Sequence, residues 1–501
     1  MVTRRLTRMS ETTAPQHRHA PDWLILTIAC VAQFMVVLDV SIVNVALPHM
    51  GTDLGMNQTQ VLWIVNAYVL TFAGFLLLGG RLADLYGRRK IYIIGVVAFT
   101  LASIVAGASH SGTEMIIARA VQGIGGAILS PATLTVIITT YQGPRMAKAI
   151  GAWSAVAGAG GAVGVLAGGL LTGLVSWRWV FYVNVPFGIV ATIAAVLYLQ
   201  EKRNQSAENK LDYTGAVLVT GGLSAFIYAV VNTTTHAWGS ATTLGWMAGG
   251  IVALIAFLFW EAKVASHPIL VFRLFHSRPL SVANIVMLMA GGAFYALWYF
   301  LTFYFQEVLG YGPVHAGFSF LPMAVCIIGG AQFSSRLVPK IGVRPLVWSG
   351  TIVATVGFYL LSLLGVHSSY WSAILLPGCL CSLAMGLLFA PLATAATSKV
   401  DRKDSGLASG VLNASRQVGG SLALAILGTI AADRTAAVLR GAMNPAAIMN
   451  QAHVDGYSRG FEIAAAITLA AFFVSLAMPD KVGHHSSHAA PSPESAGAAG
   501  H

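Results

Sequence analysis

The sequence predicts an all-α polytopic membrane protein. Hydrophobic residues make up 56% of the chain and charged residues only 9%, whereas soluble domains carry about 25% charged residues. Apolar stretches of about twenty residues recur between short polar segments, and a helix of that length spans the ~30 Å hydrocarbon layer. A chain with so little polar surface could not cover a soluble core, so the apolar stretches are expected to lie in a membrane.

Fourteen such stretches are expected to be transmembrane helices. The first follows a basic N-terminal segment, but it is too long for the 7–15 residue apolar region of a signal peptide. It is therefore predicted to be an uncleaved span. The spans are expected at about 23–49, 58–80, 91–109, 115–140, 146–173, 177–199, 212–232, 243–262, 279–306, 314–336, 343–366, 371–396, 405–432 and 460–479.

The formal net charge of +11 first suggests nucleic-acid binding, which the distribution of charge argues against. Most of the 29 basic residues fall in the tails and in alternate loops, as the positive-inside rule requires of cytoplasmic segments. The charge therefore indicates topology, with both termini in the cytoplasm and the spans in the cytoplasmic membrane. No nucleic-acid partner is expected.

The sequence lacks the motifs expected of ATP-binding, metal and disulfide sites. No Gly-Lys dipeptide occurs, so a phosphate-binding loop for ATP is not expected, and no polar segment is long enough for a nucleotide-binding domain. Any pumping must draw on an ion gradient or a partner. The four cysteines, Cys30, Cys326, Cys379 and Cys381, all fall within spans, and no disulfide, metal or other cofactor is predicted.

An internal repeat predicts the arrangement of the spans. RLADLYGRR begins at Arg81 and RLVPKIGVR at Arg336, 255 positions later, and both follow a span at equivalent places in two halves. Two six-helix bundles with two inserted helices account for the spacing, and repeat-built bundles are typical of transporters. The expected division is a cytoplasmic tail at 1–22, a first bundle at 23–199, loops and inserted helices at 200–278, a second bundle at 279–480 and a disordered cytoplasmic tail at 481–501.

Four motifs then carry a family resemblance over about residues 23–480. They are GRLADLYGRR at 80–89, LDVSIVNVALP at 38–48, RAVQGIGGA at 119–127 and WRWVFYVNVP at 177–186. Together they resemble the major facilitator superfamily, and specifically its fourteen-span drug:proton antiporters of the EmrB/QacA type. The resemblance implies the major facilitator fold, transport rather than enzymatic catalysis, and a proton gradient as the energy source.

The loop at 80–89 is expected to be a conformational latch. Glycines permit a tight turn and close helix approach, while an acid and arginines can pair or cap helix ends. The alternative is that the basic residues only anchor the cytoplasmic side. The latch residues implied are Gly80, Asp84, Gly87, Arg88 and Arg89.

Asp39 lies deep within the first span, where an ionised carboxylate costs several kcal/mol. Such a group can take up and release a proton as access alternates between the two sides. Ser41 and Asn44 lie on other faces of the helix. A structural hydrogen bond or salt bridge is the alternative role for Asp39.

Arg119 lies a few residues into the fourth span, with Gln122 on the same face at i+3. The resemblance gives Arg119 a role in proton coupling, while a snorkelling arginine at a helix end is the alternative. The sequence leaves open whether Arg119 meets Asp39.

The fifth span is rich in glycine, and Gly160, Gly164 and Gly168 recur at spacings of four, so one face can approach another helix closely. Gly169 follows directly. Related antiporters carry a Gly-Pro-x-x-Gly-Gly element here, whereas this chain has Val165 in place of the proline. The missing proline leaves uptake open as an alternative to export.

The substrate cavity is expected to draw on the ninth and thirteenth spans. The ninth, FYALWYFLTFYFQEVLGYGP, is aromatic enough to receive bulky apolar compounds, although such rings also form interfacial belts. The thirteenth span supplies two polar candidates, Asn413 and Arg416. The candidates are Phe294, Tyr295, Trp298, Tyr299, Gln306, Glu307, Asn413 and Arg416.

The predicted function is proton-driven export of amphipathic, drug-like or antibiotic molecules by alternating access. The expected partners are small-molecule substrates, protons and membrane lipids, and the expected state is a monomer. The alternatives are a proton-coupled or facilitated uptake carrier of the same fold and a non-transporting membrane receptor.

Overall fold

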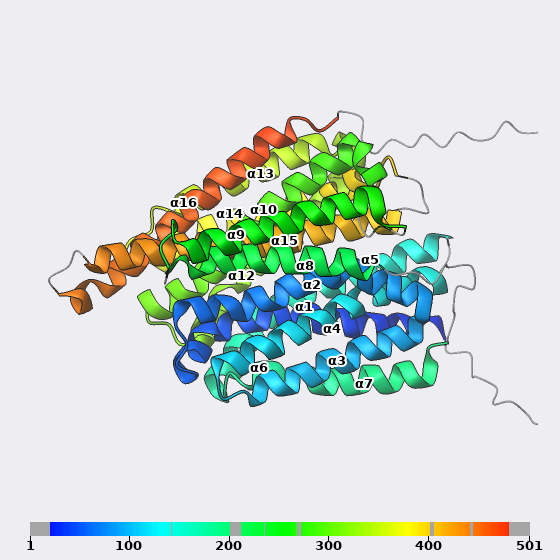
Figure 1. Ribbon diagram of the computed structural model, residues 1–501, viewed down its shortest axis with the longest axis horizontal. Helices are drawn as coiled ribbons and strands as arrows, with labels where there is room; N and C mark the ends of the chain where they lie inside the picture. Colours follow the sequence, from blue (N-terminus) through cyan, green and yellow to red (C-terminus); the bar gives the residue numbers. More distant parts are fainter. Residues whose placement is uncertain are drawn as a thin grey trace, which may run out of the picture.

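The computed structural model describes residues 21–141, 143–200, 212–234, 236–266, 268, 272–400, 405–440 and 444–479. Helices dominate this part of the chain and run roughly along one axis (Figure 1). The expectations for the tails, apart from residues 21 and 22, lie outside the described residues. A helix stands at each of the fourteen predicted positions, so the all-α class is confirmed.

The first half of the chain contains helices joined by short, well-capped turns. The side chain of Asn57 accepts a hydrogen bond from the Gln60 amide while Gln60 reaches back to the Asn57 amide, a capping box that begins α2. The Ser111 hydroxyl caps the start of α4 by accepting a hydrogen bond from the Glu114 amide. The helices are α1 (Asp22–Asp53), α2 (Gln58–Tyr86), α3 (Arg88–Ala108), α4 (Gly112–Thr140), α5 (Gly143–Leu174), α6 (Trp179–Tyr182) and α7 (Asn184–Tyr198).

The remaining helices include three short π-helical turns at or next to the ends of longer helices. These are η2 (Trp260–Val264), η4 (Tyr304–Val308) and η5 (Tyr370–Ile374). The α-helices are α8 (Tyr213–Val231), α9 (Ala241–Phe259), α10 (Arg278–Phe303), α11 (Pro313–Ser319), α12 (Leu321–Ile341), α13 (Arg344–Leu361), α14 (Leu375–Thr397), α15 (Ser405–Arg440) and α16 (Met449–Ser475).

Two predicted spans are broken by proline. The span at 177–199 divides at Val183 into α6 and α7, and the span at 314–336 divides at Phe320 into α11 and α12. Proline lacks an N–H and its ring crowds the carbonyl four residues earlier. Pro186 and Pro322 therefore remove the bonds that would have carried each helix through its break.

The segment between the predicted spans at 405–432 and 460–479, expected to be a polar connection, is largely helical instead. α15 continues to Arg440 and α16 begins at Met449, so both helices extend beyond the others at the left of Figure 1. Their polar turns are paired along the helix surface, as in the hydrogen bond from Gln451 to Asp455. Such i,i+4 pairs stabilise a helix beyond its apolar stretch.

Thirteen helices of the described part are long and apolar enough to cross a membrane. The one predicted span outside these thirteen is the fifth, at 146–173. It corresponds to α5, which has 32 residues and whose described apolar stretch is the shorter Ala159–Leu174. By length α5 also suffices to cross the ~30 Å layer.

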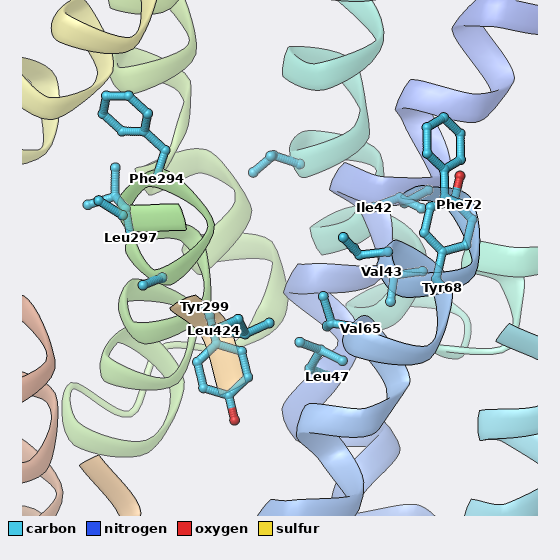
Figure 2. Close-up of a cluster of buried hydrophobic side chains, with 14 of the residues drawn as sticks. Ile42, Val43, Leu47, Val65, Tyr68, Phe72, Phe294, Leu297, Tyr299 and Leu424 are labelled. Carbon is cyan, nitrogen blue, oxygen red and sulfur yellow. The ribbon is translucent and has the colours of Figure 1, made fainter. Parts of the chain in front are cut away.

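The helices pack in two sets that share one extended apolar core. α1 packs on α5, and α4 on both α2 and α3; in the second set α10 packs on α15, and α14 on both α12 and α13. α8 contacts α9, α2 and α15, and lies between α2 and α15 in Figure 1. Leu47 and Val65 of the first set face Tyr299 and Leu424 of the second (Figure 2).

The internal repeat is visible in backbone geometry. Gly87 joins α2 to α3 with φ 98°, and Gly342 joins α12 to α13 with φ 80°. Residues with a side chain rarely adopt this region. The same left-handed glycine therefore makes the same tight turn at equivalent places in both sets.

The glycines of α5 bring it very close to α1. A Cβ on Gly160 would lie 3.2 Å from the Phe34 carbonyl oxygen, one on Gly164 would lie 2.7 Å from Cβ of Ser41, and one on Gly168 would lie 2.6 Å from the Ile42 carbonyl oxygen. No larger residue fits at Gly164 or Gly168 without moving the backbone of α1. The contacted residues lie just before and just after Asp39 in the sequence, on the face of α1 that packs on α5.

We expect Gly168→Ala to lower the stability of the folded protein by about 1–3 kcal/mol, because the added methyl overpacks the α1–α5 contact. The measurement is the thermal unfolding midpoint of the purified protein in detergent. Gly245→Ala in α9 is the control, because nothing lies within 4 Å of its Cβ position and alanine favours a helix. Equal midpoints for the two variants would contradict the close contact.

Candidate functional site

Asp39 lies in the middle of α1 and its side chain is fully buried, with 0% of its surface exposed. α1 presents it toward α3, α4 and α7, each of which supplies a polar side chain. A lone carboxylate in such a place would be strongly destabilising. The surrounding groups therefore decide whether its charge can persist.

Arg119 of α4 forms a buried ion pair with Asp39. Its Nη1 donates to Asp39 Oδ2 at 2.6 Å, and only 2% of the arginine side chain is exposed. The same Nη1 donates to Gln122 Oε1 at 2.6 Å, and Nε donates to the Ile64 carbonyl oxygen of α2 at 3.2 Å. The structure thus answers the question that the sequence left open, since Asp39 and Arg119 meet directly.

Three further side chains complete the polar cluster. Gln122 Nε2 donates to Asp39 Oδ1 at 2.7 Å and to Ser103 Oγ of α3 at 2.7 Å. Asn184 Nδ2, at the start of α7, donates to the same carboxylate oxygen at 2.9 Å and to Ser103 Oγ at 3.1 Å. Gln122, Asn184 and Ser103 are all fully buried. We refer to Asp39, Arg119, Gln122, Asn184 and Ser103 as the Asp39 cluster.

Aromatic rings cover the guanidinium of Arg119. Its Cζ lies 4.2 Å from the centre of the Tyr68 ring and 5.8 Å from that of Phe181. Both rings are buried, and a cation over a desolvated ring face gains about 2 kcal/mol. The rings also exclude water, so the Asp39–Arg119 attraction is screened little.

Sequence reasoning did not find Asn184, Ser103 or Tyr68 as site residues. Asn184 stands within the motif WRWVFYVNVP, which gave a usable signal because an asparagine in an apolar span needs a partner. Ser103 and Tyr68 had no such signal, since serine satisfies its hydroxyl within a helix and tyrosine occurs commonly in apolar cores.

The first two residues of the same motif bind the end of α1. Trp177 Nε1 and Arg178 Nη1 both donate to Asp53 Oδ2, at 2.9 and 2.8 Å, and Arg178 Nη2 donates to the Ser109 carbonyl oxygen. Asp53 is the last residue of α1. The ten-residue motif thus contacts α1 twice, at Asp53 at the end of the helix and at Asp39 in its middle.

The predicted latch residues lie at the turn between α2 and α3. Gly87 makes the turn, and Arg89 Nη2 donates to the Val196 carbonyl oxygen of α7. Arg88 is half-buried. A Cβ on Gly80 would meet Pro131 at an ordinary 3.6 Å, and the side chain of Asp84 lies outside the described part of the chain.

Contacts between the two helix sets gather toward the end of the molecule at which α1 passes into α2, here called the α1–α2 end. Gln306 Nε2 donates to the Val45 carbonyl oxygen at 2.8 Å, and its Oε1 lies 3.1 Å from His49 Nδ1. Gln58 Nε2 donates to the Tyr299 hydroxyl at 2.8 Å. At this end the two sets are in direct polar contact.

Gly169 belongs to this interface and not to the α1–α5 contact. A Cβ there would lie 2.5 Å from the Pro313 carbonyl oxygen of α11. A Cβ on Gly173, one turn further along α5, would lie 2.7 Å from Cγ2 of Val314. α5 therefore packs tightly on α1 by one face and on α11 by another.

Most of the predicted cavity residues take part in packing. Phe294 is buried against Phe358 and Phe389, and Trp298 lies 5.0 Å from Phe320 between ring centres. Tyr295 donates to Gln417 Oε1 at 2.8 Å. Phe294 thus belongs to the apolar core of the second helix set.

The polar candidates occupy three different places. Glu307 accepts a hydrogen bond from the Tyr457 hydroxyl at 2.7 Å, and His453 Nδ1 lies 3.1 Å from it, so Glu307 faces α16. The Arg416 guanidinium lies 5.5 Å from the centre of the Phe389 ring. Asn413 is half-buried on α15.

A pocket of about 370 Å³ lies between α1 and α5. Its lining residues are Leu26, Thr27, Cys30, Val31, Phe34 and Val156. The apolar lining offers contact area to an apolar molecule or a lipid chain alike. Within the described residues, no group of three His, Cys, Asp or Glu side chains is placed to hold a metal ion.

Sequence comparison relates the chain to a family of transporters. The model of the Major Facilitator Superfamily matches residues 29–424. The cephamycin export protein CmcT of Amycolatopsis lactamdurans is 41% identical, with 82% of this chain and 85% of that protein covered. The puromycin resistance protein pur8 of Streptomyces alboniger is 36% identical, covering 92% and 91%.

A third relative and a solved structure extend the likeness. The tetracenomycin C resistance and export protein of Streptomyces glaucescens is 32% identical, covering 82% of this chain and 76% of that protein. A bacterial homologue of the human lysosomal transporter Spinster, solved in an inward-facing and unoccupied conformation, superposes with a TM-score of 0.62. At 15% identity, covering 91% of this chain and 97% of that one, it shows a shared fold.

We expect Arg119→Met to destabilise the protein by about 3–5 kcal/mol, because it leaves the carboxylate of Asp39 buried without its cation. The double variant Asp39→Leu, Arg119→Met should recover most of that loss, since apolar residues can replace a buried pair. Thermal unfolding of both proteins measures the difference.

Arg459→Met is the matched control. Arg459 pairs with Glu462 on the surface of α16, where about half of each side chain is exposed, and such pairs contribute at most about 1 kcal/mol. A loss as large as that of Arg119→Met would show that removal of any arginine is harmful, whatever its partner.

Proposed function

The chain belongs to the major facilitator superfamily, and from that premise we propose that it is a proton-driven antiporter that exports amphipathic antibiotic-type molecules across the cytoplasmic membrane. The observation that carries the proposal is the buried Asp39–Arg119 pair in the middle of α1. It is a titratable acid, fully removed from water, held by one cation on a different helix.

The physical basis is the cost of burying charge. Asp39 keeps its charge only while Arg119 and the two amide donors, Gln122 and Asn184, surround it, because an unpaired buried carboxylate would bind a proton instead. Any movement of α1 relative to α4 changes that surrounding. Proton uptake and release at Asp39 are thus tied to the relative position of the helices, and this coupling is what an antiporter requires.

Alternating access accounts for the distribution of contacts. We assign the α1–α2 end to the outside, because the basic residues favour a cytoplasmic N-terminus. There Gln306, Gln58 and Gly169 hold the two sets together, so the outer side is closed. The α2–α3 turn then lies in the cytoplasm, where Arg89 tied to α7 supports its role as part of a latch.

The two sets correspond to the proposed bundles at 23–199 and 279–480, with α8 and α9 inserted between them in sequence. Outward opening would separate α5 from α11 and α1 from η4, while the contacts within each set persist. The proton gradient is the proposed energy source, with no enzymatic activity and no cofactor. A single chain contains both bundles, which supports a monomer as the working unit.

The substrate class follows from the relatives. They are named for the export of cephamycin, for resistance to puromycin and for resistance to and export of tetracenomycin C. We therefore propose antibiotics with both apolar and polar parts as the substrates. The pocket beside Phe34 supplies apolar contact area.

Uptake by the same fold is the second candidate. The observation that favours it is Val165, which stands where related antiporters carry a proline. α5 runs from Gly143 to Leu174 without a break. Export and uptake differ in the direction of substrate flux relative to the proton, which vesicles of known orientation can measure.

In everted vesicles with an acidic lumen, we expect substrate to accumulate in the lumen while protons leave it. Asp39→Asn should abolish uphill transport, because the side chain can no longer exchange a proton. The measurements are uptake of labelled puromycin and the lumenal pH. Asp455→Asn, which changes an acid at the outer end of α16, is the control and should transport normally.

Substrate and proton moving in the same direction would favour uptake over export. Full uphill transport by Asp39→Asn would remove Asp39 from the coupling mechanism, whatever the direction.

A further inference from the structure

The groups around Asp39 are hydrogen-bond donors toward it. Oδ2 accepts from Arg119 Nη1, and Oδ1 accepts from Gln122 Nε2 and Asn184 Nδ2. This arrangement suits an ionised carboxylate, which only accepts. When a proton binds, one of the two oxygens becomes a donor and needs an acceptor that it does not have here.

Two of the three neighbours are poorly suited to supply that acceptor. Arginine has no acceptor atom. Gln122 has a carbonyl oxygen, but that oxygen already accepts from Arg119 Nη1 at 2.6 Å. Turning Gln122 over would remove an acceptor from Arg119 when the cation is losing its carboxylate partner.

Asn184 is the third neighbour, and its side-chain carbonyl oxygen is available as an acceptor. Its Oδ1 is buried and has no hydrogen-bond partner in the described structure, and an unsatisfied buried carbonyl is itself costly. Rotation of the amide by half a turn about its last side-chain bond would exchange Oδ1 and Nδ2. The carbonyl oxygen would then stand near 2.9 Å from Asp39 Oδ1 and 3.1 Å from Ser103 Oγ, the distances that Nδ2 holds now.

We propose that Asn184 is a positioning residue of the proton site whose side-chain amide reverses when Asp39 is protonated. With Asp39 ionised, Nδ2 donates to the carboxylate. With Asp39 neutral, the new O–H on Oδ1 donates to Asn184 Oδ1. The proton comes from water on the open side and leaves to water on the other, and no other bond is made or broken.

This inference rests on the proposed function, because it takes Asp39 as the proton carrier. The charged or titratable groups that face Asp39 are Arg119 from α4 and Tyr68 from α2. The side chains that α3 and α7 supply are uncharged: Ser103 bonds Asn184, and Asn184 itself bonds Asp39. From α5, Gly164 approaches the neighbouring residues Leu38 and Ser41. Asn184 is therefore the neighbour able to serve both charge states of the acid while Gln122 stays with Arg119.

The position of Asn184 in the fold gives the reversal a mechanical consequence. It is the first residue of α7, directly after the break at Val183, and Phe181 before the break covers Arg119. The α6–α7 segment thus contacts both members of the ion pair. A change in the bond between Asn184 and Asp39 acts on the segment that also covers the cation.

The test is infrared difference spectroscopy of the full chain in lipid, comparing high with low pH. In the unaltered protein the carboxylic acid C=O band of Asp39 should have the frequency of a hydrogen-bonded acid. In Asn184→Leu it should shift to the higher frequency of an acid whose O–H has no acceptor. Asn184→Ala, which is smaller and fits the same space, gives the same test if the leucine variant does not fold.

Asn284→Leu is the matched control. Asn284 is also a buried asparagine, but it binds Ser415 and the Leu280 carbonyl oxygen within the second helix set. Its removal should leave the acid band in place.

A second readout separates proton coupling from substrate handling. Asn184→Ala should slow pH-driven transport of puromycin about tenfold. Exchange of labelled for unlabelled puromycin at equal pH should slow much less, because exchange needs no change in the protonation of Asp39. Loss of both activities together would indicate a purely structural role and overturn the proposal.

Two spectroscopic outcomes distinguish failure of the role of Asn184 from failure of the proposed function. An acid band that disappears in Asp39→Asn but does not move in either Asn184 variant would overturn the role of Asn184 and leave the proposed function standing. An acid band that persists in Asp39→Asn would show that another group carries the proton, and both proposals would fail.

Discussion

The ion pair between Asp39 and Arg119 is the constraint on which the rest of the structure depends. Two charges 2.6 Å apart in a water-free interior attract strongly, but each also loses its hydration, and the balance is favourable only with further hydrogen bonds. α2, α3, α4 and α7 supply these bonds through the Ile64 carbonyl, Ser103, Gln122 and Asn184. The pair therefore fixes the relative positions of five helices of the first set.

Close glycine packing keeps this site dry. α5 lies so near α1 at Gly164 and Gly168 that no side chain or water separates their backbones there, and Tyr68 and Phe181 cover the cation from other directions. In a low-dielectric site, moving one proton changes the interaction energies far more than it would in water. A small chemical event at Asp39 can in this way bias the packing of whole helices.

The sequence predicted the helices well because their signal is long and redundant. Twenty apolar residues identify a span whatever their order, and the repeat around Gly87 and Gly342 indicated two related sets. The predicted helix boundaries were wrong in two kinds of place. Proline divided two spans, near Val183 and Phe320, and polar side-chain pairs extended two helices into the segment between Asp433 and Arg459. In the site, Asp39 was predicted because charged groups are rare in spans. Arg119 was predicted from the family resemblance, and Gln122 from its place on the same helix face.

Contacts between distant segments were beyond sequence reasoning. Nothing in the order of residues places Ser103 between two amide nitrogens or sets Asn184 beside Asp39, since both depend on how α3 and α7 cross α1. The cavity residues stay a prediction, because an aromatic run supplies core and cavity alike. Packing places one of them, Phe294, in the apolar core.

The π-turn η4 at the end of α10 contacts both helix sets. In the π-turn η4 the adjacent residues Gln306 and Glu307 point in different directions, the first to α1 and the second to α16. The bond to α16 stays within one set, whereas the bond to α1 joins the two sets and must break when they separate. Because both bonds lie on consecutive residues, α10 cannot release α1 by melting this turn without also loosening α16. Separation of the sets as rigid bodies, with the turn intact, is therefore the less costly movement. α1 then connects Asp39 directly to the contact between the two sets at Val45.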